Sequence, residues 1–130
     1  MTPFPYSIAP SANLEQAAAM MEEHDVRHLP VCDANHQVVG ILSQRELRVG
    51  LAGGDGNARG VLEVCTKDPL LVDLDRPLDS VTEEMAEMRI GSAIVMRGDK
   101  LAGILTTTDV CRLLTELLRK HGGVEDDDVA

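Results

Sequence analysis

The sequence feature that most limits the fold of this chain is an internal repeat that runs through almost all of it. A shift of 64 residues aligns Thr2 with Thr66. After the loss of one residue in a turn, a shift of 63 aligns Gly40-Ile41-Leu42 with Gly103-Ile104-Leu105. The match keeps its order to about residue 115 with this single gap. Such a repeat indicates two copies of one structural unit.

The pattern within each copy predicts a strand followed by a helix. Residues 6–9 and 70–73 are short apolar runs after a proline, which favours strands. Asn13 followed by Gln16 is typical of a capped helix start. Apolar residues then recur at helical spacing. They are Leu14, Ala17, Ala18 and Met21 in the first copy, and Leu78, Val81, Met85 and Met88 in the second.

Two strands and a second helix complete each copy. Residues 28–33 and 37–42 predict one strand pair, and residues 92–97 and 100–105 predict another around Gly98-Asp99, a two-residue hairpin signal. The closing helices are predicted to begin at Ser43 and Thr106. The apolar stripe of the last helix consists of Val110, Leu113, Leu114, Leu117 and Leu118. Between the copies, a short helical segment is predicted at residues 60–66.

The net charge of −10 argues against several classes of partner. A chain this acidic is a poor partner for nucleic acids and anionic membranes. One Phe, one Tyr and no Trp leave no platform for stacking bases. The N-terminus does not resemble a signal peptide, and no apolar run reaches the roughly 18 residues that a membrane span needs. We therefore expect a cytoplasmic protein.

Cys32, Cys65 and Cys111 are scattered and odd in number, without a Cys-x-x-Cys pair. This spacing argues against a zinc centre and against a disulfide framework. We expect three small buried side chains and no metal site. The sequence contains no recognisable pairing of a nucleophile with a base, so we expect no enzyme activity.

Five segments carry a family resemblance: residues 14–17, 26–33, 40–47, 89–95 and 103–110. In this order they resemble the CBS domain family, the cystathionine-β-synthase-type repeat that occurs in tandem pairs. The resemblance implies an α/β (α+β) fold in which two β-α-β-β-α repeats, related by a pseudo-two-fold axis, form one CBS-pair module. We expect these parts in chain order: repeat 1 at 1–52, a linker at 53–60, repeat 2 at 61–121 and an acidic disordered tail at 122–130.

The resemblance also implies a function. CBS pairs bind adenosyl ligands such as AMP, ADP, ATP or S-adenosylmethionine between their halves, and they usually regulate another protein. We therefore expect a non-catalytic nucleotide-sensing module that requires no cofactor and has an unknown regulated partner. The alternative is a ligand-free dimeric interaction or scaffold protein with the same fold. A homodimer is expected in either case, through the apolar stripes of the first helix of each copy or through Leu113 and Leu117.

The motif at residues 103–109 supplies Thr106, Thr108 and Asp109 as candidate binding residues. A hydroxyl and a carboxylate three residues apart at a helix start face the same opening. Asp109 can accept the hydroxyl groups of a ribose, while Thr106 and the helix N-terminus can bind a phosphate. The same spacing also fits a capping box. In the first copy, Ser43 and Glu46 occupy these positions, and the longer Glu46 side chain puts a ribose contact in doubt.

The remaining candidates follow from the resemblance. Basic residues at the positions of Arg27 and His28 reach ligand phosphates in the family, although both could instead be ordinary surface or packed side chains. We expect a purine ring to be flanked by Ile90, Ser92 and Ala93, which could equally be strand core. Tyr6 could stack on an adenine, but core packing is the favoured interpretation.

Overall fold

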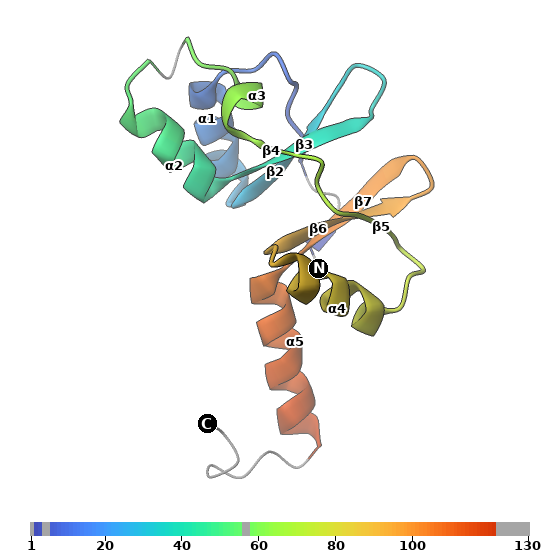
Figure 1. Ribbon diagram of the computed structural model, residues 1–130. Helices are drawn as coiled ribbons and strands as arrows, with labels where there is room; N and C mark the ends of the chain where they lie inside the picture. The colour runs from blue at the N-terminus through green and yellow to red at the C-terminus, as the bar shows by residue number, and fades with distance from the viewer. Residues whose placement is uncertain (1, 4–5, 56–57, 122–130) are drawn as a thin grey trace.

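The computed structural model describes residues 2–3, 6–55 and 58–121, so the predicted tail lies outside the described residues. Two halves follow one another along the chain (Figure 1). The first half contains α1 (Leu14–His24), β2 (His28–Cys32), β3 (Val38–Ser43), α2 (Gln44–Ala52) and the short α3 (Val61–Val64). The second half contains β5 (Leu71–Asp73), α4 (Leu78–Met88), β6 (Ser92–Arg97), β7 (Lys100–Thr106) and α5 (Thr107–Lys120).

The two halves exchange short strands, and the exchange follows the internal repeat. β1 (Thr2–Pro3) lies in the sheet of the second half, where Thr2 is paired with Ile104 of β7. β4 (Thr66–Lys67) lies in the sheet of the first half, where Thr66 is paired with Ile41 of β3. The resulting sheet orders are β1-β7-β6-β5 and β2-β3-β4. These equivalent registers agree with the pseudo-two-fold relation expected of the two repeats.

The strand predicted at residues 6–9 is wrong in extent. Only Ile8 forms a bridge there, parallel to Val31. Its counterpart in the second half is the full parallel pairing of β5 with β6, in which Val72 is paired with Val95. The hairpin prediction is confirmed in both halves, because β2 pairs with β3 and β6 pairs with β7 in antiparallel fashion.

Three helices begin with complete capping boxes, which explains where the chain changes from strand or loop to helix. In α1, the Asn13 side chain accepts from the Gln16 backbone N–H at 2.8 Å, and the Gln16 side chain accepts from Asn13 in return. Ser43 and Thr106 are the N-caps of α2 and α5. The predicted starts of these helices are therefore confirmed.

Each half has its own aliphatic core. In the first half, the core includes Leu14, Met21, Leu29 and Leu47, so both α1 and α2 contribute to it. In the second half, Val81 and Met85 of α4 pack against the sheet. The α5 helix adds only the partly buried Val110. No residue of α5 is buried, and the helix extends away from the sheets (Figure 1).

Burial decides the expectation for the three cysteines. Cys65 is buried and Cys32 is partly buried, but Cys111 lies exposed on α5, so the expectation of three buried cysteines is wrong. Burial raises the pKa of the Cys32 and Cys65 thiols. Within the described part of the chain, no helix combines the length and apolar character needed to cross a membrane.

Candidate functional site

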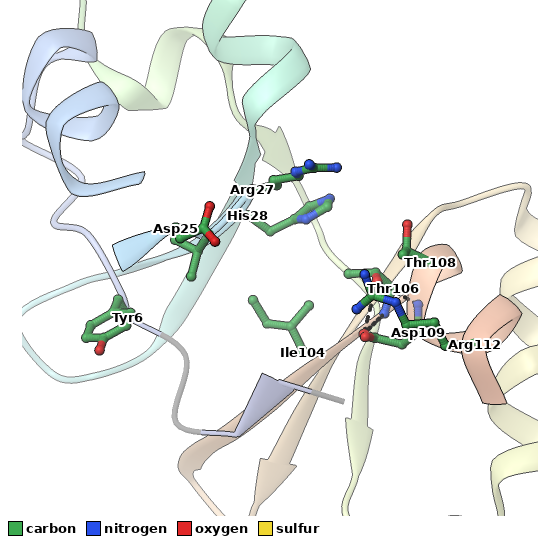
Figure 2. A pocket seen from close by; sticks show the side chains of 10 residues that line it. Tyr6, Asp25, Arg27, His28, Ile104, Thr106, Thr108, Asp109 and Arg112 are labelled. Atoms are coloured by element: carbon green, nitrogen blue, oxygen red, sulfur yellow. Dashed lines mark hydrogen bonds between the residues drawn. The ribbon is translucent and has the colours of Figure 1, made fainter. Parts of the chain in front are cut away.

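A cavity of about 300 Å³ lies between the two halves. The first half contributes one wall, from Tyr6 and the segment that leads into β2. The second half contributes the other wall, from the end of β7 and the start of α5. Figure 2 shows Arg27 and His28 on one side, facing Thr106, Thr108, Asp109 and Arg112 on the other. Five predicted site residues therefore meet in one pocket, although they come from distant parts of the sequence.

The wall from the second half is built by the capping box of α5. Asp109 Oδ2 accepts from the Thr106 backbone N–H at 2.9 Å and from the Thr106 hydroxyl at 3.0 Å. The Asp109 backbone N–H donates to Thr106 Oγ1 at 3.2 Å. The alternative of a capping box is thus confirmed for this motif. The same bonds hold the carboxylate, the hydroxyl and the positive end of α5 at the pocket wall.

The wall from the first half contains the basic pair. Arg27 is exposed, and the half-buried His28 is the first residue of β2. Burial lowers the pKa of His28 from its usual 6.5, and Arg27 acts in the same direction. The carboxylates of Glu46 and Asp109 oppose this shift. The protein environment therefore favours the uncharged form of the imidazole.

The end of the pocket away from α5 combines the aromatic ring of Tyr6 with the carboxylate of Asp25. The ring of Tyr6 stacks on the ring of His24 with centroids 3.6 Å apart and planes 10° from parallel. Tyr6 is 47% exposed, so its expected place in the core is wrong. Ile104 lines the pocket near its centre, and Asp25, in left-handed conformation after α1, lies on the side of Tyr6 (Figure 2).

Arg112 and Asp25 are pocket residues that the sequence analysis missed. Arg112 follows Asp109 by three residues on α5, a spacing that places both on one face of the helix. That spacing was available in the sequence and could have identified Arg112. Nothing in the local sequence around Asp25 indicates a site, because its position depends on how the end of α1 meets the second half.

The equivalent motif of the first half does not reach this pocket. Glu46 Oε1 accepts from the Ser43 backbone N–H at 2.8 Å, and Glu46 Oε2 accepts from the Thr66 hydroxyl at 2.6 Å. Glu46 instead borders a separate hollow of about 320 Å³ beside Arg45 and Arg59. Both carboxylate oxygens of Glu46 are therefore engaged in holding α2 and β4 together.

The residues expected to flank a purine lie outside the pocket lining. Ala93 is 1% exposed and belongs to the core of the second half. Ser92 is paired with Thr106 across β6 and β7. Ile90 borders a hollow between α4 and α5 together with Met85 and Val110. Among the described residues, no group of three or more His, Cys, Asp or Glu side chains is arranged to hold a metal ion.

Comparison with known proteins gives a consistent picture. Residues 1–53 and 61–116 match the protein family described as CBS domain. Hypoxic response protein 1 of Mycobacterium tuberculosis is 31% identical over 105 residues, which cover 79% of this chain and 73% of that protein. The chain also matches three relatives with enzyme names, but it spans only 21–22% of their length.

Solved structures share the whole arrangement. The crystal structure of AcuB from Vibrio cholerae, a protein named for acetoin utilization, superposes with a TM-score of 0.76 at 30% identity, covering 96% of this chain and 93% of that one. The CBS domain pair of protein MJ0100, crystallised with 5′-methylthioadenosine and S-adenosyl-L-methionine, superposes with a TM-score of 0.75 at 26% identity. That match covers 88% of this chain and 92% of the other.

Proposed function

The chain belongs to the CBS domain family, and from that premise we propose that it is a regulatory module that binds an adenosyl nucleotide of the AMP, ADP or ATP type. The observation that carries this proposal is the single pocket in which Arg27 and His28 of one repeat face Thr106 and Asp109 of the other. The ligands of the MJ0100 domain pair support the choice of an adenosyl compound.

The chemistry of the pocket suits the parts of such a ligand. The Asp109 carboxylate is fixed by its bonds to Thr106 and lies where it can accept from ribose hydroxyls. In the first turn of α5, Thr108 can offer its backbone N–H and its hydroxyl to an anion, because the N–H groups of Thr107 and Asp109 already donate to the Gly91 carbonyl and to Thr106 Oγ1. The side of Ile104 and Tyr6 offers an apolar and aromatic surface to the base.

Asp109→Asn is the decisive variant. It keeps the size of the side chain and removes its charge, so a charge-assisted bond to ribose worth about 1.5–3 kcal/mol is weakened. We expect at least tenfold weaker AMP binding in calorimetry, which is about 1.4 kcal/mol. Glu46→Gln is the matched control, because it makes the same change in the capping box of the other repeat and should leave affinity unchanged.

A second measurement separates ribose contact from folding. Wild-type protein should bind 2′-deoxy-AMP at least tenfold more weakly than AMP if Asp109 accepts from the ribose hydroxyls. If both ligands bind equally and Asp109→Asn only lowers the melting temperature, Asp109 acts as a helix cap alone. Absence of a thermal shift with AMP, ADP, ATP and S-adenosylmethionine would favour the ligand-free scaffold.

We also propose that the module is a homodimer. The stripe of α1 is used inside its own half, since Leu14 and Met21 are buried there. Apolar side chains remain exposed on α5, where Leu114 and Leu117 are each 53% exposed. A two-fold contact that covers this face of α5 would remove it from water. A homodimer through α5 is compatible with both the nucleotide-sensing module and the ligand-free scaffold.

The module acts without catalysis of its own and passes nucleotide occupancy to a regulated protein. It would do so in the cytoplasm, where adenosyl nucleotides are abundant. The relatives matched over most of their length carry no enzyme name, which supports the non-catalytic role.

A further inference from the structure

Arg112 places a second guanidinium group at the pocket, on the side opposite to Arg27. It lies in the second turn of α5, one turn after Asp109. Among the described residues, the side-chain ion pairs of arginine are those of Arg59 with Glu63 and of Arg76 with Glu84. Arg27 and Arg112 are instead exposed at the pocket.

Arg27 and Arg112 belong to different repeats. A ligand group that interacts with both has to be an anion in the cavity between the repeats. A guanidinium group presents a planar set of donors that fits phosphate oxygens in bidentate fashion. Arg27 of the first repeat and Arg112 of the second line the same cavity, so each brings a positive charge to a phosphate bound there. Two carboxylates also line the cavity: Asp25 lies on the side of Tyr6, away from Arg112 (Figure 2), while Asp109 lies on the same wall as Arg112, so Arg27 and Arg112 together have to outweigh Asp109 at a bound anion.

We infer that Arg112 is a specificity-determining residue that selects adenosyl ligands carrying a phosphate over those that are uncharged or carry a sulfonium group. The inference rests on the proposed function and extends it from the adenosyl class to the charge of the ligand. A sulfonium centre near Arg27 and Arg112 would be repelled, whereas a phosphate would be attracted from both halves. An uncharged nucleoside would keep only the contacts to its ribose and base.

The test compares Arg112→Ala with Arg119→Ala. Arg119 lies in the last turn of the same exposed helix, so its removal changes the net charge equally without altering the pocket. Calorimetry with AMP and with adenosine separates the phosphate from the rest of the ligand. Arg112→Ala should weaken AMP binding at least tenfold and change adenosine binding less than twofold, while Arg119→Ala should change neither.

Arg112→Lys and a salt series complete the experiment. Lysine keeps the charge but lacks the planar donor set, so its AMP affinity should lie between those of wild type and Arg112→Ala. The AMP affinity of wild type should fall more steeply with salt than that of Arg112→Ala. Equal losses for AMP and adenosine would assign Arg112 a structural role and overturn the inference.

The two proposals fail in different ways. If adenosine and AMP bind wild type and Arg112→Ala equally well, the specificity role is wrong and the adenosyl site remains. If neither adenosine nor any adenine nucleotide binds wild-type protein, the adenosyl site itself is wrong, and the role of Arg112 is overturned with it.

Discussion

The two repeats share their strand registers and the cap of their last helix, yet they differ in how that helix packs. In the first repeat, α2 packs against α1 so closely that a Cβ atom on Gly50 would lie 2.8 Å from Leu14 Cδ1. In the second repeat, α5 starts from an equivalent cap but buries none of its residues. The repeated motif therefore determines where the helix begins, while the side chains beyond the first turn determine what it covers.

Glu46 and Asp109, the equivalent carboxylates of the two repeats, also differ in what they contact. Glu46 bridges its own helix cap and Thr66 of the exchanged strand. Asp109 is one methylene shorter and lies at the wall of the shared pocket. Both carboxylates cap their helices, but Glu46 also links its helix to the exchanged strand, whereas Asp109 caps its helix at the wall of the pocket.

The largest expected effect concerns association. Leu114→Glu combined with Leu117→Glu places two charges on the exposed stripe of α5, which should weaken the proposed dimer at least a thousandfold, about 4 kcal/mol. Light scattering should then give 14.0 kDa instead of twice that mass. Val49→Glu is the control, because Val49 is 70% exposed on α2 and should leave the dimer intact. Dissociation by Val49→Glu alone would place the interface on the first repeat.

Core truncation should be more costly in the first repeat than in the second. Leu47 of α2 is buried, so Leu47→Ala should lower the free energy of unfolding by about 3 kcal/mol. The equivalent residue in the repeat alignment, Val110 of α5, is only partly buried. Val110→Ala should cost about 1 kcal/mol or less in the same denaturant titration. Equal losses would show that α5 is buried as fully as α2 in solution.

The bond between Thr66 and Glu46 can be tested without touching the pocket. Thr66→Val removes the hydroxyl that donates to Glu46 and should lower the free energy of unfolding by about 1 kcal/mol. Thr107→Val, which removes a longer 3.2 Å bond to the Gly91 carbonyl, should cost less. Because Glu46 does not line the pocket of the proposed function, calorimetry of both wild type and Thr66→Val should give one nucleotide per chain. A second binding event would mean that only this bond prevents the first repeat from binding.

The smallest effect is a dependence of stability on pH that belongs to the first repeat. Because the pKa of His28 is lowered on folding, the unfolded chain binds more protons as the pH falls below 6.5. Stability of the ligand-free protein should therefore fall as the pH is lowered below 6.5, and this loss should level off once His28 is protonated in the folded protein as well. The second repeat has Ser92 at this position. His28→Gln should flatten the profile of melting temperature, while His36→Gln, in the exposed turn, should not.

Much of the fold could be predicted because its signals are local. Gly98-Asp99 forms the predicted hairpin turn, and Ser43 and Thr106 form the predicted caps, since each depends on residues within a few positions. The exchange of β1 and β4 could not be predicted in this way, because pairing between distant strands leaves no mark in a two-residue segment. The exposure of α5 could not be predicted from the sequence either, because its apolar stripe has the same spacing as that of a helix packed on a core.

For the candidate site, individual residues could be predicted, but their arrangement in space could not. Thr106 and Asp109 were found from the spacing of a motif, and Arg27 and His28 from a family resemblance. Their meeting in one pocket depends on how the two halves face each other. The burial of Ala93 could not be predicted, because a small residue in a strand has the same sequence pattern whether it lines a ligand or fills a core.

The exchanged strands bear on how such a chain could arise. A chain with only the first repeat would lack Thr66 and Lys67, and the outer edge of β3 would present unpaired backbone groups to any passing strand. Such a half would protect that edge by receiving the equivalent strand from a second molecule. The fraction of protected molecules would then depend on protein concentration. Joining two copies in one chain makes the donor permanently local, at an effective concentration in the millimolar range for a short connection. Gene duplication would thus convert a strand swap between molecules into an internal one and relieve the fold of its dependence on expression level.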